Sequence, residues 1–231
     1  MTVATRSARG EFYKDITYDP AQYGPDTPLG DIVTQAGLTL DAGQYVPNAR
    51  LEVSKSTYKL RLFSGDRLLK TYRIQISGKY PVGDKKRRGD GRTPEGTYRV
   101  CRHNRASRYY RSLILNYPNA SDIDEAVAAK RITEAKAAGL RAALEAGKCP
   151  PSNTSLGGDI LIHGQNPKVT AQVRREQRGR HRREGLEPGD LDPATLKLLY
   201  NWTLGCVGMT NPDIRELYQY VPDGAVVVIA P

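Results

Sequence analysis

The sequence has few cysteines, few large aromatic residues other than tyrosine, and no long apolar runs. Three cysteines occur among 231 residues, together with one tryptophan and two phenylalanines. There is no Cys-x-x-Cys pair and the three histidines are scattered, so we expect no metal site. The P-loop, dinucleotide-binding and Gly-x-Ser-x-Gly motifs are absent, and we expect no cofactor.

The apolar runs are too short for a membrane-spanning helix, which needs roughly 18 apolar residues, so no membrane span is expected. The first 14 residues (MTVATRSARGEFYK) contain no apolar segment typical of a signal peptide. Either the protein stays inside the cell or an export segment has been removed. Hydrophobic residues make up 39% of the chain, which indicates a folded globular protein.

The chain is strongly basic, with a formal net charge of +10. Such a charge favours an anionic partner: nucleic acid, lipid headgroups or an acidic wall polymer. The basic residues cluster at 85–88 and 174–183. Neither cluster is interleaved with aromatic residues, as a single-strand nucleic-acid platform would be. We interpret both as solvated loops and expect no nucleic-acid partner.

Short alternating segments dominate the chain and predict β-strands. These segments are 50–53, 59–63, 69–77, 97–101, 113–115, 159–162 and 224–229. Short turns join the first of them, which is typical of an antiparallel sandwich or barrel. We predict a mainly β fold with helical insertions, in which the loop 79–93 keeps its basic side chains out of the core.

Helices are expected in four places: 31–36, 122–146, 193–201 and 211–220. We expect Ser121 to cap the second, Gly139 to break it into a hairpin and Gly147 to end it, while Asn211 caps the last. This organisation predicts an irregular N-terminal lead-in at 1–48 and one catalytic domain at 49–231. The domain carries a helical insertion at 120–148 and a basic loop insertion at 165–190.

Cys206 and His163 are the residues that best fit a chemical role. A thiol becomes a strong nucleophile when a nearby imidazole removes its proton. Gly205, before the cysteine, would let backbone approach a substrate carbonyl, and the amides of Gly205 and Cys206 could hold the developing oxyanion. The opposing interpretation is a small buried cysteine and a structural histidine.

Several segments of the sequence resemble the L,D-transpeptidase catalytic domain, also called the YkuD-type domain. Ile162-His163-Gly164 is similar to its strand-end histidine-glycine pair, and residues 203–211 (TLGCVGMTN) to its Ser-His-Gly-Cys segment, with Asn211 in register. Residues 59–78 resemble the opening hairpin, 91–98 (GRTPEGTY) the Thr-Pro-x-Gly turn, and 222–227 the last turn and strand. The similar blocks occur in the family's order.

The resemblance implies a β-sandwich or barrel-like fold and a cysteine-dependent L,D-transpeptidase. By that resemblance, Cys206 attacks a peptidoglycan stem peptide to form a thioester, His163 accepts and donates the proton, and the Gly164 carbonyl orients the imidazole. Oxyanion and substrate contacts would come from Gly205, Thr203, Asn211 and Arg92. Acylation by carbapenem-type inhibitors and a periplasmic or secreted location would follow.

Two residues differ from the family pattern. Leu204 stands where the pattern has histidine, and Gly208 stands where it has arginine. An arginine there could hold a carboxylate with two hydrogen bonds, which glycine cannot do. The differences leave open an amidase or L,D-peptidase that hydrolyses peptidoglycan or a link between the wall and an attached protein. A cell-wall-binding module without activity is a further alternative.

The two remaining cysteines leave two possibilities. If Cys101 pairs with Cys149, Cys206 is the free thiol, and an oxidising compartment is indicated. Otherwise Cys101 and Cys149 are two unpaired buried thiols.

Overall fold

The computed structural model describes residues 2–3, 16–17, 27–77, 82–165 and 203–231. Its strands are β1 (Thr2–Val3), β2 (Ile16–Thr17), β3 (Ala49–Ser54), β4 (Lys59–Ser64), β5 (Arg67–Arg73), β6 (Gly96–Asn104), β7 (Ser112–Leu115), β8 (Leu161–His163), β9 (Val207–Gly208) and β10 (Val226–Ala230). Its helices are α1 (Leu29–Gln35), α2 (Ala120–Ala128), α3 (Glu134–Glu145) and α6 (Asn211–Tyr220).

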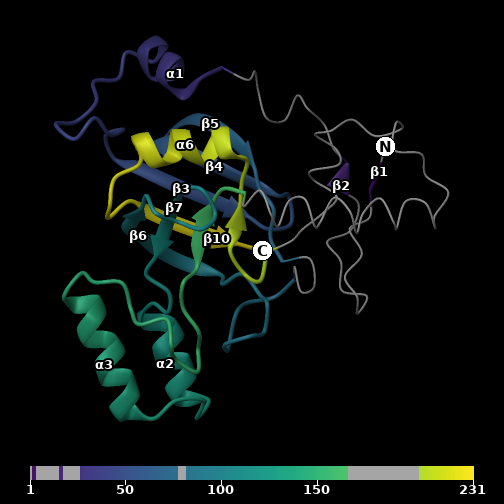
Figure 1. Cartoon of the computed structure of the whole chain (residues 1–231), viewed down its shortest axis with the longest axis vertical. Helices are drawn as coiled ribbons and strands as arrows, with labels where there is room; N and C mark the ends of the chain where they lie inside the picture. Colours follow the sequence, from purple (N-terminus) through teal and green to yellow (C-terminus); the bar gives the residue numbers. More distant parts are fainter. Residues whose placement is uncertain (1, 4–15, 18–26, 78–81, 166–202) are drawn as a thin grey trace.

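A single eight-stranded sheet organises the fold, in the order β5-β4-β3-β10-β6-β7-β8-β9. The mainly β prediction with helical insertions is confirmed (Figure 1). Most neighbours are antiparallel, as expected, but β10 pairs with β3 in parallel and β8 pairs with β9 in parallel. These two pairings join segments far apart in sequence, so no local turn signal indicated them.

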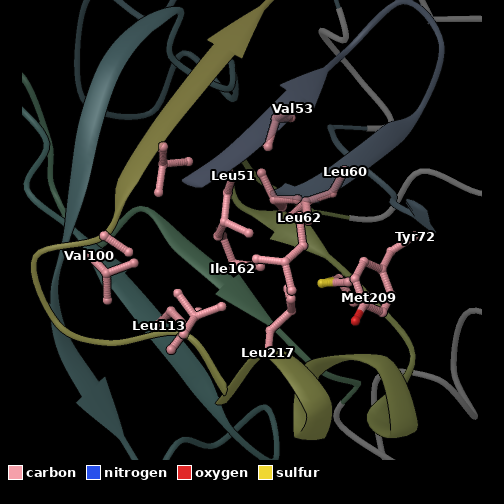
Figure 2. Close-up of a cluster of buried hydrophobic side chains, with 14 of the residues drawn as sticks. Leu51, Val53, Leu60, Leu62, Tyr72, Val100, Leu113, Ile162, Met209 and Leu217 are labelled. Atoms are coloured by element: carbon pink, nitrogen blue, oxygen red, sulfur yellow. The ribbon is translucent and has the colours of Figure 1, made fainter. Parts of the chain in front are cut away.

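The core lies between the sheet and α6. Alternation in β3 buries Leu51 and Val53 on one face, while α6 buries Ile214 and Leu217 on its inner face. Figure 2 shows Leu217 directed into the cluster formed by strand residues such as Leu51 and Leu62. Each fully buried leucine or isoleucine stabilises the fold by about 1.5–3 kcal/mol. The same core supports β8 and β9, the two strands that carry the candidate site.

Two helices, α2 and α3, form in the segment predicted as a helical insertion, but the predicted cap and break were wrong. Asn119, rather than Ser121, caps α2, because it forms a reciprocal capping box with Asp122. The break falls before Thr133, which caps α3, and Gly139 lies inside that helix. Helix α3 ends as predicted, with Gly147 in the left-handed region at φ 65°. In Figure 1 the two helices form a pair beside the sheet (green).

Three further expectations need correction. Asn211 is the first residue of α6 rather than its cap, because the Thr210 side chain accepts from the Asp213 amide. The strand predicted at 69–77 is β5, which ends at Arg73, and only isolated bridges form between Arg73 and Ser77. Lys85 was expected outside the core but is buried, since its ammonium group is paired with the Asp90 carboxylate at 2.9 Å.

The lead-in packs onto the same core through Leu29, Val33 and Val46. Helix α1 begins two residues earlier than predicted. The basic insertion at 165–190, beyond Gln165, and the helix predicted at 193–201 lie outside the described residues. The division at residue 48 stays a prediction. No helix among the described residues is long and apolar enough to cross a membrane.

A disulfide joins Cys101 in β6 to Cys149, which follows α3. It closes a loop of sequence separation 48 that contains both insertion helices. The pairing considered from the sequence is therefore present, and Cys206 is the free cysteine. Closing a loop of this size stabilises a fold by about 2–4 kcal/mol.

Reduction should raise the intact mass of the protein by two hydrogen atoms, because one disulfide is opened. Cys101→Ser with Cys149→Ser should lower the free energy of unfolding by about 2–4 kcal/mol, measured by urea denaturation. An unchanged mass on reduction of the denatured wild type would contradict the disulfide.

Candidate active site

His163 ends β8 and is almost completely buried, with 1% of its surface exposed. Its Nδ1 lies 2.7 Å from the Gly164 carbonyl oxygen, which can only accept a hydrogen bond, so Nδ1 carries the hydrogen. Burial is the main reason that the pKa of His163 is lowered to about 4, although the Gly164 hydrogen bond raises it. At neutral pH the imidazole is uncharged, with its basic lone pair on Nε2.

Cys206 lies just before β9 and is partly exposed. Its thiol donates to the Asp159 carbonyl oxygen at 3.5 Å. Burial of the sulfur is the main reason that the pKa of Cys206 is raised to about 11, while a hydrogen bond from the Leu161 backbone lowers it. The resting group is therefore a thiol rather than a thiolate.

The pairing of β8 with β9 places both residues on one face of the sheet. Ile162 is opposite Val207 and His163 is opposite Gly208. Extending this register by one residue places Cys206 opposite Leu161, in agreement with its contact to the Leu161 backbone. Because alternate residues share a face, Cys206 and His163 point the same way, two residues or roughly 7 Å apart along the strands.

The segment that carries Cys206 is fixed at both ends against residues 75–77. Gln75 and Gly208 exchange two backbone hydrogen bonds, of 2.8 and 2.7 Å, and the Thr203 amide donates to the Ile76 carbonyl. The Thr203 hydroxyl donates to the Cys206 carbonyl at 2.8 Å and accepts weakly from the Gly205 amide at 3.4 Å. Thr203 thus shapes the turn that presents the thiol.

Gly205 meets a requirement that a side chain would violate. Its φ of 123° is rarely adopted by other residues, and an added Cβ would lie 2.5 Å from the Arg92 carbonyl oxygen. Backbone of the 82–95 loop therefore packs directly against the turn before Cys206. The sequence predicted a glycine here for the approach of backbone to a substrate carbonyl, and that stays a prediction; the close approach seen in the structure is to the protein's own backbone at Arg92.

Lys55 holds the two ends of the 82–95 loop through hydrogen bonds from its ammonium group. Its ammonium group is fully buried and donates to the Gly83 carbonyl at 2.8 Å and to the Glu95 carboxylate at 2.6 Å. Arg92 contributes in the same way, because its guanidinium donates to the Val82 carbonyl at 2.8 Å. The Arg92 backbone lies next to the candidate site, at Gly205, and its guanidinium contact is made within its own loop.

Asn211 connects α6 to the end of β8. Its Oδ1 accepts from the Gln165 amide at 2.7 Å, and a Cβ on Gly164 would lie 2.5 Å from the same oxygen. The small size of Gly164 is therefore required by packing, while its backbone carbonyl makes the contact with His163. The Asn211 side chain therefore contacts the backbone that follows His163.

A family comparison identifies the fold that carries this arrangement. The model of the L,D-transpeptidase catalytic domain (YkuD) matches residues 48–229, well over half of the chain. The protein belongs to the L,D-transpeptidase catalytic-domain family. It is therefore a member of a peptidoglycan-related enzyme family. A search of curated proteins returns no match.

Several solved structures are similar to this L,D-transpeptidase domain. The helical cell shape determining protein Pgp2 from Campylobacter jejuni has TM-score 0.42 and 19% identity, over 78% of this chain and 46% of that one. Bd1075 from Bdellovibrio bacteriovorus has TM-score 0.41 and 17% identity, over 83% of this chain and 50% of that one. L,D-transpeptidase 3 from Mycobacterium tuberculosis, in complex with a faropenem-derived adduct, has TM-score 0.41 and 12% identity, over 80% of this chain and 61% of that one.

The chain spans about half the length of the first two of these proteins. All three similarities are low, so the family assignment depends on the catalytic-domain match. Within that match, Leu204 is 82% exposed beside the thiol, and Gly208 leaves the position opposite His163 without a side chain.

Three residues near the site were not singled out from the sequence. The ring of Tyr109 lies 4.3 Å from the His163 ring at an angle of 30°. The guanidinium carbon of Arg108 lies 5.0 Å from the centroid of the same Tyr109 ring. Asp159, with φ 51°, supplies the carbonyl that meets the thiol. Tyr109 and Arg108 come from the connection between β6 and β7, which had no recognisable motif.

No group of three or more His, Cys, Asp or Glu side chains that could hold a metal ion occurs within the described ranges.

The rate of Cys206 alkylation by iodoacetamide should rise about tenfold per pH unit from pH 7 to pH 9.5, because the thiolate fraction grows this way below a pKa of about 11. The disulfide leaves Cys206 as the target in native protein, and Cys206→Ala provides the blank. A rate that is constant between pH 6 and pH 9 would contradict a resting thiol and indicate a thiolate–imidazolium pair.

Gly205→Ala should lower the free energy of unfolding by more than Gly65→Ala. Both glycines have positive φ, but nothing lies within 4 Å of a Cβ on Gly65. Backbone strain alone should cost about 1–3 kcal/mol at either site, and the Arg92 contact adds to it at Gly205. Urea midpoints measure the difference; equal midpoints would contradict the close approach at Gly205.

Proposed function

We propose that this protein is a cysteine-dependent L,D-transpeptidase that acts on peptidoglycan stem peptides through a thioester. The observation that carries the proposal is a neutral, buried His163, oriented by the Gly164 carbonyl, on the same sheet face as the free thiol of Cys206. In this proposal Cys206 is the nucleophile, His163 the proton acceptor and donor, and Gly164 the orienting group.

The first half of the reaction forms the acyl-enzyme. His163 Nε2 removes the thiol proton while the sulfur bonds to the carbonyl carbon of the L,D-peptide bond. Since the free thiol and imidazole are both neutral, this transfer accompanies substrate attack rather than preceding it. The amides of Gly205 and Cys206 stabilise the oxyanion. The carbon–nitrogen bond then breaks, and the amine leaves with the proton from His163.

The second half releases the acyl group. An acceptor amine attacks the thioester, His163 removes a proton from that amine, and the thiolate of Cys206 leaves and is protonated. Thr203 and Asn211 assist by holding the turn at Cys206 and the strand end at His163, and we propose Arg92 as a further residue at the substrate-binding side.

Hydrolysis is the second candidate outcome, supported by the residues next to Cys206. Gly208 provides no cation opposite His163, and exposed Leu204 provides no polar group beside the thiol. With weaker contacts to an acceptor peptide, water could resolve the thioester. The enzyme would then be an amidase or L,D-peptidase that cuts peptidoglycan or releases a wall-attached protein.

The location proposed is periplasmic or secreted. The disulfide between Cys101 and Cys149 supports an oxidising compartment. Peptidoglycan stem peptides would be the partner, and the net charge of +10 suits an acidic wall polymer.

Incubation with disaccharide-tetrapeptides and with cross-linked muropeptides, followed by mass spectrometry, tests these outcomes. New cross-links or exchanged terminal residues are expected for a transpeptidase, and lost cross-links or lost terminal residues for a hydrolase. Cys206→Ala should abolish either product, and His163→Gln should reduce its rate at least 100-fold. If no muropeptide changes and Cys206→Ala binds wall material as the wild type does, the domain is a binding module and the enzyme proposal is wrong.

Meropenem should acylate the same sulfur, because attack on the β-lactam carbonyl requires the same nucleophile and base. The expected result is a mass increase equal to one inhibitor molecule in the wild type and none in Cys206→Ala. An adduct of equal yield in the variant would place the nucleophile elsewhere.

A further inference from the structure

We propose that Arg108 binds the terminal carboxylate of the acyl donor, one residue beyond the bond that Cys206 attacks. The proposal extends the proposed function, since it names the group on the substrate that the site recognises. A stem peptide cut before its last residue presents that carboxylate close to the scissile carbonyl. A cation beside the nucleophile can bind such an end through charge-assisted hydrogen bonds.

Arg108 is held beside the catalytic pair by a stack of rings. Its guanidinium carbon lies 5.0 Å from the centre of the Tyr109 ring, and that ring lies 4.3 Å from the ring of His163. A cation over an aromatic face is favoured by about 0.5–1 kcal/mol at an exposed site. The stack therefore orders Arg108 against Tyr109, whose ring contacts the imidazole, without consuming its hydrogen-bond donors.

The backbone around Arg108 is tied to the same strand end. The Gly164 amide donates to the Arg111 carbonyl at 3.2 Å, and a Cβ on Gly164 would lie 2.9 Å from the Tyr109 carbonyl oxygen. The connection between β6 and β7 is thus packed against the residue that follows His163. Arg108 keeps its place relative to the candidate catalytic pair.

The charge of Arg108 reaches both reactive groups. It lowers the pKa of His163 and the pKa of Cys206, as a nearby positive charge must. Because the charge of Arg108 acts on both the sulfur and the imidazole, Arg108 lies close enough to contact the carboxylate of a peptide bound at these two groups.

Two other cations near the site are already paired. Lys85 is buried against the Asp90 carboxylate, and Arg92 donates to the Val82 carbonyl. Arg108 is exposed, and across the described ranges it forms no hydrogen bond or ion pair. Gly208 contributes no charge. Arg108 is therefore a cation in the described site whose donors are available to a ligand, and a planar guanidinium matches a carboxylate with two parallel hydrogen bonds.

Two tetrapeptide donors that differ at one group test this assignment: one with a free terminal carboxylate and one with a terminal carboxamide. The full chain is compared as wild type, Arg108→Ala, Arg108→Lys and Arg105→Ala. Arg105 is the matched control, since it is exposed on the same connection. The quantity measured is the ratio of acylation kcat/KM between the two donors.

We expect the wild type to favour the carboxylate donor by about tenfold. Arg108→Ala should lose that preference through a drop with the carboxylate donor alone, Arg108→Lys should retain part of it, and Arg105→Ala should retain all of it. Loss of kcat/KM in equal proportion for both donors would overturn carboxylate binding and assign Arg108 to positioning His163 through Tyr109. An unchanged ratio would also overturn it.

Calorimetry in a Cys206→Ala background keeps this proposal separate from the chemistry. Binding of the carboxylate peptide should weaken about tenfold when Arg108 is also changed to alanine, while binding of the carboxamide peptide should not. If the wild type acylates with neither donor, the proposed function fails; an Arg108-dependent difference in binding would then still support the carboxylate site, and equal binding would overturn it.

Discussion

The parallel pairing of β8 with β9 is the constraint on which the candidate active site depends. It joins two short strands, one ending at His163 and one starting after Cys206, and sets the register that directs both side chains to one face. Neither strand could hold this position alone. The shared core beneath them, which includes Ile162 and Val207, and the backbone bonds from Gln75 supply the support.

The surroundings of the pair keep it uncharged at rest. Burial lowers the pKa of His163 and raises the pKa of Cys206, so both act against a thiolate–imidazolium pair. The hydrogen bond to Gly164 fixes the tautomer that leaves a lone pair on Nε2. A site of this kind acquires its charges when substrate is bound. Groups that meet the substrate, such as the amides near Gly205, then control reactivity.

Much of the fold could be predicted from the sequence, and candidate site residues could be named, because these signals are local. Alternation predicted most of the sheet's strands, and the glycines beside His163 and Cys206 indicated close backbone approach. Signals that depend on distant partners were missed. The parallel pairs and the ring stack of Tyr109 on His163 join segments whose separation along the chain conceals their contact. The burial of Lys85 was missed although its partner, Asp90, is only five residues away. The predicted cap at Ser121 was wrong because Asn119 and Asp122 cap each other.

The most direct measurement of the central claim is the intact mass of protein quenched in acid during turnover of a disaccharide-tetrapeptide. The account predicts a covalent adduct equal to the donor minus its terminal residue, located on the peptide that contains Cys206 and released by hydroxylamine. Absence of any adduct during demonstrated turnover, or an adduct that persists in Cys206→Ala, would contradict a thioester formed by Cys206 with His163.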